Sequence, residues 1–126
     1  MKRIVLVEDE RILAMTLKFE LARKGYTVLA TAGSGEEAIA AVREHAPQIL
    51  IMDISINGAM SGIDTAHAIS EFATTPVVFL TGECDADTRM RALATPHARG
   101  YLTKPMNMLE LEAMLQSIAL EAAPLL

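Results

Sequence analysis

Five residues that could do chemistry stand directly after short, largely apolar runs in the sequence. Glu8 and Asp9 follow the first such run, and Asp53, Thr81 and Lys104 follow three later ones. Three carboxylates gathered in one place would repel one another and raise each other's pKa unless a cation neutralised them. Mg²⁺, a hard cation that prefers oxygen ligands, would serve that purpose. A lysine and a hydroxyl beside it could contact the oxygens of a transferred phosphoryl group, so the set indicates phosphoryl transfer.

Each of these residues also has an ordinary structural interpretation. The acidic pair could cap a helix, because carboxylates match the dipole at a helix N-terminus. Asp53 could form a turn, Thr81 could be a β-branched strand residue, and Lys104 could be an exposed lysine before a strand-breaking proline. No single signal is specific, so the interpretation depends on whether the fold brings these residues together.

Apolar runs alternate along the chain with longer amphipathic segments. We expect five strands, at residues 4–7, 26–31, 48–52, 76–80 and 100–103. Strict alternation of this kind favours a parallel α/β sheet with right-handed crossovers and helices on both faces. In such sheets sites form beyond the carboxyl ends of the strands. That placement would collect all five chemical residues on one rim.

Local signals mark the ends of several helices. Ser34, Ser61 and Asn107 each precede an acidic residue by three positions, the spacing of a capping box. Gly25 predicts the end of the first helix. We expect a short fourth helix with a weak apolar pattern within residues 85–94.

The composition restricts the class of protein. The chain has 126 residues, of which 52% are hydrophobic, and this suits one domain of residues 1–126 with a sizeable core. A net charge of −5 argues against binding to nucleic acid or an anionic membrane. A single cysteine allows no internal disulfide, and no apolar stretch suits a signal peptide or membrane span. We therefore expect a cytoplasmic domain.

The motifs of competing chemistries are missing. The sequence has neither a glycine-rich phosphate loop followed by Lys-Ser/Thr nor a dinucleotide fingerprint after its first strand. Its three histidines show no metal spacing. Cys84 has no CxxC partner and follows Glu83, which would raise the pKa of the thiol. Nucleotide hydrolysis, dinucleotide binding and redox chemistry are therefore disfavoured.

The ordered set of Glu8-Asp9, Asp53, Thr81 and Lys104-Pro105 resembles the receiver domain of two-component response regulators. The resemblance covers about residues 3–120. It implies a flavodoxin-like fold, a doubly wound five-stranded parallel sheet with strand order 2-1-3-4-5. It also implies a signalling switch that takes a phosphoryl group on Asp53 from a histidine kinase or a histidine phosphotransfer protein. The switch would then act on a downstream protein through a changed partner-binding face.

The resemblance further implies a cation and its ligands. Asp9 would bind Mg²⁺ (or Mn²⁺) directly, and Glu8 would bind it mainly through water. Asp53 and the backbone carbonyl of Ser55 would complete the protein ligands. The cation would thus lie beside the phosphoacceptor.

Other residues would handle the phosphoryl group and its consequences. Lys104 would contact it, Thr81 would move in to bond it, and Tyr101 would follow by a change of rotamer. Without the resemblance, Tyr101 would be interpreted as a half-buried aromatic on an edge strand.

Ser55 and Glu83 occupy positions that tune dephosphorylation in the family. The Lys104-Pro105 bond is expected to be cis. The protein would assist its own phosphorylation and slow dephosphorylation without being an enzyme.

The loop after the phosphoacceptor departs from the common pattern of the family. Gly62 lies nine residues after Asp53, one residue further than usual, and Gly58 is an extra glycine. The loop of residues 54–62 is similar to variant receivers that read D-I-x-L-x-G-x-M-D-G-I. Its conformation and the choice of partner are open at this point.

Two other functions stay open as well. The chain could be a protein-interaction module that keeps the fold without being phosphorylated, or the receiver part of a larger kinase or effector chain. The presence of Asp53 and Lys104 disfavours the first alternative. A monomer and a phosphorylation-linked dimer are both compatible with the sequence.

Overall fold

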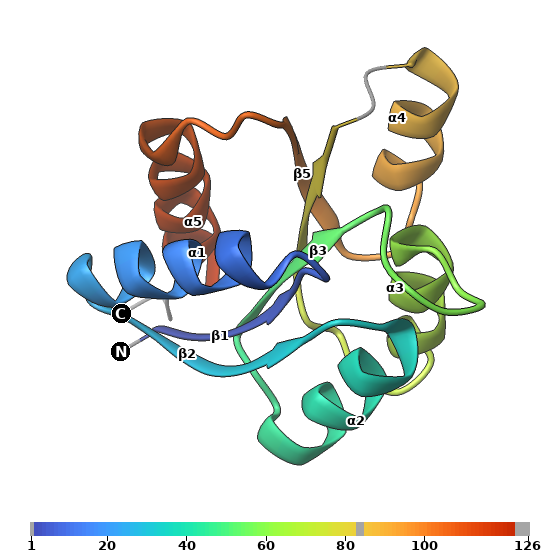
Figure 1. Ribbon diagram of the computed structural model, residues 1–126, viewed down its shortest axis with the longest axis horizontal. Coiled ribbons are helices and arrows are strands. Elements are labelled where there is room, and N and C mark those ends of the chain that lie inside the picture. Colours follow the sequence, from blue (N-terminus) through green and yellow to red (C-terminus); the bar gives the residue numbers. More distant parts are fainter. Residues whose placement is uncertain (1, 83–84, 123–126) are drawn as a thin grey trace.

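The computed structural model describes residues 2–82 and 85–122, which form alternating strands and helices (Figure 1). In chain order the elements are β1 (Lys2–Val7), α1 (Arg11–Arg23), β2 (Tyr26–Ala32), α2 (Gly35–His45), β3 (Ile49–Asp53), α3 (Gly62–Ser70), β4 (Val77–Thr81), α4 (Ala86–Leu93), β5 (Ala98–Thr103) and α5 (Met108–Ala122). Glu83, with its predicted role in dephosphorylation, and Cys84 lie outside the described residues.

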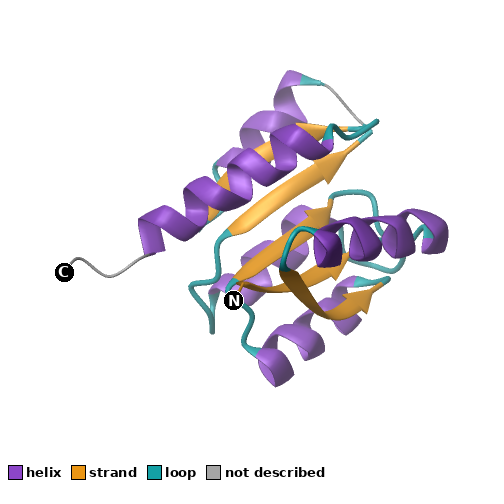
Figure 2. Ribbon diagram, turned by 90° about the vertical axis from the view of Figure 1, so that its left-hand side faces the viewer, coloured by secondary structure: helices purple, strands orange, loops and turns teal. Residues whose placement is uncertain are grey.

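The five strands form one parallel sheet in the order β2-β1-β3-β4-β5. This confirms the predicted doubly wound fold and its strand order. Helices α1 and α5 cover one face of the sheet, while α2, α3 and α4 cover the other, so the sheet is the middle of three layers (Figures 1 and 2). The central strands are consequently buried on both faces, as their continuous apolar runs predict.

The two hydrophobic cores divide each central strand with a period of two. On β1, Ile4 and Leu6 pack in the core beneath α1 and α5, whereas Val5 and Val7 pack in the core beneath α2 and α3. Successive side chains of a strand point to opposite faces, so each core receives alternate residues. The two cores together hold the sheet between both helix layers and position the strand ends.

The predicted helix ends are confirmed in detail. The hydroxyl of Ser34 accepts a hydrogen bond from the Glu37 amide at 3.2 Å, and that of Ser61 accepts one from the Asp64 amide at 3.1 Å. The residue that follows the α1 C-cap, Gly25, has a φ of +92°. Left-handed geometry of this kind favours glycine.

Strand boundaries differ from the prediction by a residue or two. β1 begins at Lys2 and β5 at Ala98, both earlier than the apolar runs begin. Lys2 pairs with Tyr26, and Ala98 pairs with Val77. Backbone pairing extends a strand regardless of side-chain polarity, so the apolar pattern alone underestimates its length.

Candidate functional site

The predicted site residues do meet at one edge of the sheet. β1 and β3 pair level at Val7 and Met52, so the residues that follow Val7 lie beside Asp53. Thr81 ends β4, next to β5, and Lys104 follows β5 directly. The edge corresponds to the upper right ends of the central strands in Figure 1. The parallel register thus brings together residues from four separate parts of the chain.

Three carboxylates form a compact cluster on this edge. Glu8, Asp9 and Asp53 each offer an oxygen within 4.8 Å of the other two. Glu8 and Asp53 are buried, with 3% and 2% of their surfaces exposed, whereas Asp9 is half-buried. Oxygen ligands at this spacing suit a hard divalent cation. The donor set of the cluster fits Mg²⁺.

Burial has a large effect on Glu8. Loss of solvation and, after it, the neighbouring Asp53 carboxylate together raise the pKa of its carboxyl to about 8, against the opposing effect of Lys104. A buried carboxylate beside another one is costly to ionise. A cation bound at the cluster would favour the ionised form of Glu8.

Lys104 joins the two buried carboxylates. Its Nζ donates to Asp53 Oδ2 at 2.9 Å and lies 3.2 and 3.3 Å from the two carboxylate oxygens of Glu8. Burial alone would lower the pKa of Lys104, but Asp53 and Glu8 outweigh that effect and raise it. The lysine is therefore a stable cation beside Asp53. The Lys104-Pro105 bond is cis, as predicted.

The helix-cap interpretation does not account for Glu8. The N-cap residue of α1 is Glu10, and its side chain makes no capping hydrogen bond. Glu8 instead accepts hydrogen bonds from Lys104. The carboxylate therefore belongs to the cluster at the strand ends.

The remaining predicted residues lie around this cluster. The amide of Ser55 donates to Asp53 Oδ1 at 3.0 Å, which ties the start of the following loop to the carboxylate. Thr81 is fully buried at the end of β4. Tyr101 is half-buried on the edge strand β5, and the guanidinium of Arg89 lies 5.5 Å from the centre of its ring. The switch roles of Thr81 and Tyr101 remain predictions.

Sequence reasoning missed how the loop after Asp53 is held. Asn57 of this loop pairs with Ser34 in an isolated parallel β-bridge, so the loop lies against the start of α2. The extra glycine, Gly58, has a φ of +100°. Such a backbone conformation favours glycine, and the additional glycine was thus the available signal for an unusual loop conformation.

Comparison with known sequences identifies the class of protein that this fold and site define. Residues 4–116 match the response regulator receiver domain, and the chain belongs to this family. It is a receiver domain of the kind found in two-component response regulators, and its family supports a place in phosphorelay signalling.

Individual relatives agree with this assignment. The chain is 34% identical over 110 residues to the transcriptional regulatory protein PdtaR of Mycobacterium tuberculosis, covering 87% of this chain and 53% of that protein. It is 32% identical over 114 residues to the transcriptional regulatory protein YvrH of Bacillus subtilis, covering 90% and 47%. The chain thus spans about half the length of these curated relatives.

Solved structures agree as well. The crystal structure of the signal receiver domain of a modulated diguanylate cyclase from Desulfovibrio desulfuricans superposes with a TM-score of 0.85 at 32% identity, covering 96% of this chain and 98% of that one.

Within residues 2–82 and 85–122, no helix is both long and apolar enough to cross a membrane.

Proposed function

We propose that this domain is a phosphorylation-dependent switch in which Asp53 accepts a phosphoryl group from the phosphohistidine of a histidine kinase or a histidine phosphotransfer protein. The main support is the geometry at Asp53, whose Oδ2 lies 2.9 Å from Lys104 Nζ and whose carboxylate belongs to the acidic cluster. Burial of several carboxylates beside a lysine costs free energy, and such clusters are therefore typical of functional sites.

The transfer would proceed by nucleophilic attack. A carboxylate oxygen of Asp53 forms a bond to phosphorus while the bond between phosphorus and the imidazole nitrogen breaks, and the imidazole departs. The product is an acyl phosphate on Asp53. Lys104, held as a cation, would contact the oxygens of the phosphoryl group as it arrives. We propose that the domain acts as a stoichiometric acceptor that assists this step, and so is not an enzyme.

The residues of the cluster would also hold the cation. Asp9, Asp53 and the backbone carbonyl of Ser55 would bind Mg²⁺ or Mn²⁺ directly, and Glu8 would do so mainly through water. The ion, when bound, supplies positive charge that neutralises the phosphoryl oxygens. Without it, the crowded carboxylates would oppose the approach of a further anion.

The acyl phosphate would then change a partner-binding face. Its oxygens provide new acceptors, to which the hydroxyl of Thr81 would bond by moving inward. Tyr101 would occupy the space that this movement frees, and the face built from α4, β5 and α5 would change with it. The downstream partner in this proposal is a protein.

Phosphorylation of the full chain tests the proposal. Incubation with acetyl phosphate and Mg²⁺ should add the mass of one phosphoryl group, measured by mass spectrometry of the intact protein. Asp53→Asn should abolish the addition. The matched control is Asp64→Asn, which changes an exposed aspartate in the first turn of α3 and should leave phosphorylation intact. An unchanged mass of the wild type with several phosphodonors would support the interaction module instead.

A further inference from the structure

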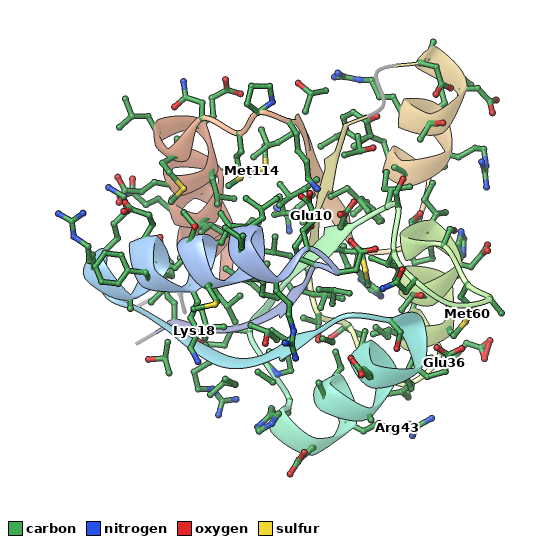
Figure 3. All side chains as sticks on the ribbon, viewed as in Figure 1. Glu10, Lys18, Glu36, Arg43, Met60 and Met114 are labelled. Atoms are coloured by element: carbon green, nitrogen blue, oxygen red, sulfur yellow. The ribbon has the colours of Figure 1, made fainter. Side chains whose placement is uncertain are left out.

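The loop that follows the phosphoacceptor, residues 54–61 (the acceptor loop), is docked on the first turn of α2. Asn57 forms the bridge to Ser34. Gly58 lies so close to α2 that an added Cβ would stand 3.2 Å from Glu36 Oε2. Figure 3 shows Met60 in the acceptor loop and Glu36 in α2, on two segments that lie next to each other.

Gly35 is the centre of this contact. A Cβ at this position would lie 2.5 Å from Thr65 Oγ1 and 2.9 Å from the terminal methyl carbon of Met60. Thr65 is fully buried, and its hydroxyl donates to the carbonyl of Ser61 at 2.8 Å. The side chains of Met60 and Thr65 thus close over Gly35, and α2 approaches the loop only because this residue has no side chain.

The same loop is tied to the phosphoacceptor at its other end. The Ser55 amide donates to Asp53 Oδ1 at 3.0 Å. The amide of Gly62 donates to the carbonyl of Ile54 at 2.8 Å, which closes the end of the loop onto its beginning. A displacement of Met60 would therefore be transmitted through a few residues to the backbone around Ser55.

On the opposite side the loop has less support. A cavity of about 330 Å³ lies between it and α4, lined there by Thr88 and Arg91. A segment that borders an open space on one side takes its position from the contacts on the other. The α2 contact is accordingly the one that sets where the acceptor loop lies.

We propose that Gly35 is a positioning residue for the cation site, which it serves by fixing the acceptor loop and with it the backbone of Ser55. This inference rests on the proposed cation-dependent phosphorylation of Asp53. Groups that orient metal ligands without touching the ion typically change metal affinity by about 10–100-fold when they are altered. Gly35 would act through Met60 and Thr65 in this way.

Two variants of the full chain test the proposal, with Mg²⁺ affinity measured by titration calorimetry and stability measured by urea unfolding. Gly35→Ala should weaken Mg²⁺ binding about 10-fold, because the methyl group pushes the loop away. Gly33→Ala is the matched control: its Cβ would lie 3.6 Å from the nearest atom, an ordinary contact, and its affinity should stay within about twofold of the wild type.

The outcomes separate this inference from the proposed function. If Gly35→Ala unfolds more easily but binds Mg²⁺ like the wild type, Gly35 is merely a packing residue and the inference is wrong, while the proposed function stands. If the wild type itself binds no Mg²⁺, both are wrong. Should Gly35→Ala fail to fold, Met60→Ala removes the loop side of the same contact without inserting an atom. It should weaken Mg²⁺ binding several-fold, and an unchanged affinity would overturn the inference.

Discussion

The two sides of Asp53, the proposed phosphoacceptor, are built differently. On the α2 side, helix α2 buries Gly35, Ala38, Ala41 and Val42. Gly35 packs so closely against Met60 of the acceptor loop that no Cβ would fit between them. On the α4 side, helix α4 buries only Ala92 among its residues, and a cavity of about 330 Å³ separates it from the same loop.

This difference indicates where movement costs least free energy. Regions with few buried apolar contacts open and shift more readily than densely packed ones. Asp53 lies between the two sides, so in the proposed function a phosphoryl group on it would meet a fixed side toward α2 and an adjustable side toward α4. A signal that starts at Asp53 should therefore leave the molecule through α4 and its neighbours, where the exposed side chain of Met90 lies.

The largest expected effect compares the glycine that directly follows the acceptor loop with the glycine that follows β4 on the α4 side. At Gly62, which opens α3, an added Cβ would collide with the carbonyl of Asp53 and lie 2.8 Å from the Cα of Ile54. Because backbone atoms cannot move aside, Gly62→Ala should lower the free energy of unfolding by about 3 kcal/mol in urea denaturation. Gly82→Ala, where a Cβ would meet nothing within 4 Å, should change it by about 0.5 kcal/mol or less. Equal losses in the two variants would mean that the backbone after Asp53 and the backbone before α4 are packed equally tightly.

The second prediction concerns the carboxylates of the site. In the absence of a divalent cation, the pKa of Glu8 is about 8 in the folded protein, against 4.5 as the ordinary value. The folded state therefore holds an extra proton between these pH values. Its contribution to stability should be complete below pH 4.5 and be lost as the pH rises through 8. The full pKa difference corresponds to about 5 kcal/mol, and because solvent screening reduces it we expect a decline of about 2 kcal/mol, measured by urea unfolding in EDTA.

Two variants sharpen this second test. Glu8→Gln cannot ionise, so the decline between pH 5 and 8 should disappear in it. Met90→Ala, on the exposed surface of α4, should keep the full decline, because the carboxylates are placed independently of α4. A flattened curve in Met90→Ala would show that the site and α4 are coupled even without phosphorylation.

The smallest expected effect is a difference in local stability between the two helices. Backbone amides of α4 should exchange with deuterium about tenfold faster than those of α2, because α4 buries one residue where α2 buries four. Hydrogen exchange followed by mass spectrometry of peptides measures both helices in one sample. Similar protection of α2 and α4 would contradict the distinction between a fixed and an adjustable side.

Much of the fold could be predicted because its signals are local. Buried strands read as apolar runs, and Ser34 and Ser61 mark helix starts by spacing alone. The alternation of the two patterns favours a parallel sheet, and parallel strands end on the same edge. The strand order came from the resemblance to receiver domains. The ends of β1 and β5 were less predictable, because backbone pairing with a neighbouring strand decides where a strand begins.

The sequence by itself therefore determined which residues reach the rim: Asp53 ends a strand, and Lys104 and the acidic pair each follow one, whatever the details of packing. Only the tertiary structure decided how they interact there. Lys104 lies between Glu8 and Asp53 across 96 and 51 positions of the chain, and burial is what raises the pKa of Glu8. The contact of Gly35 with Met60 and Thr65 is of the same kind. Distances between residues far apart in sequence depend on the packing of whole elements, and no local pattern encodes them.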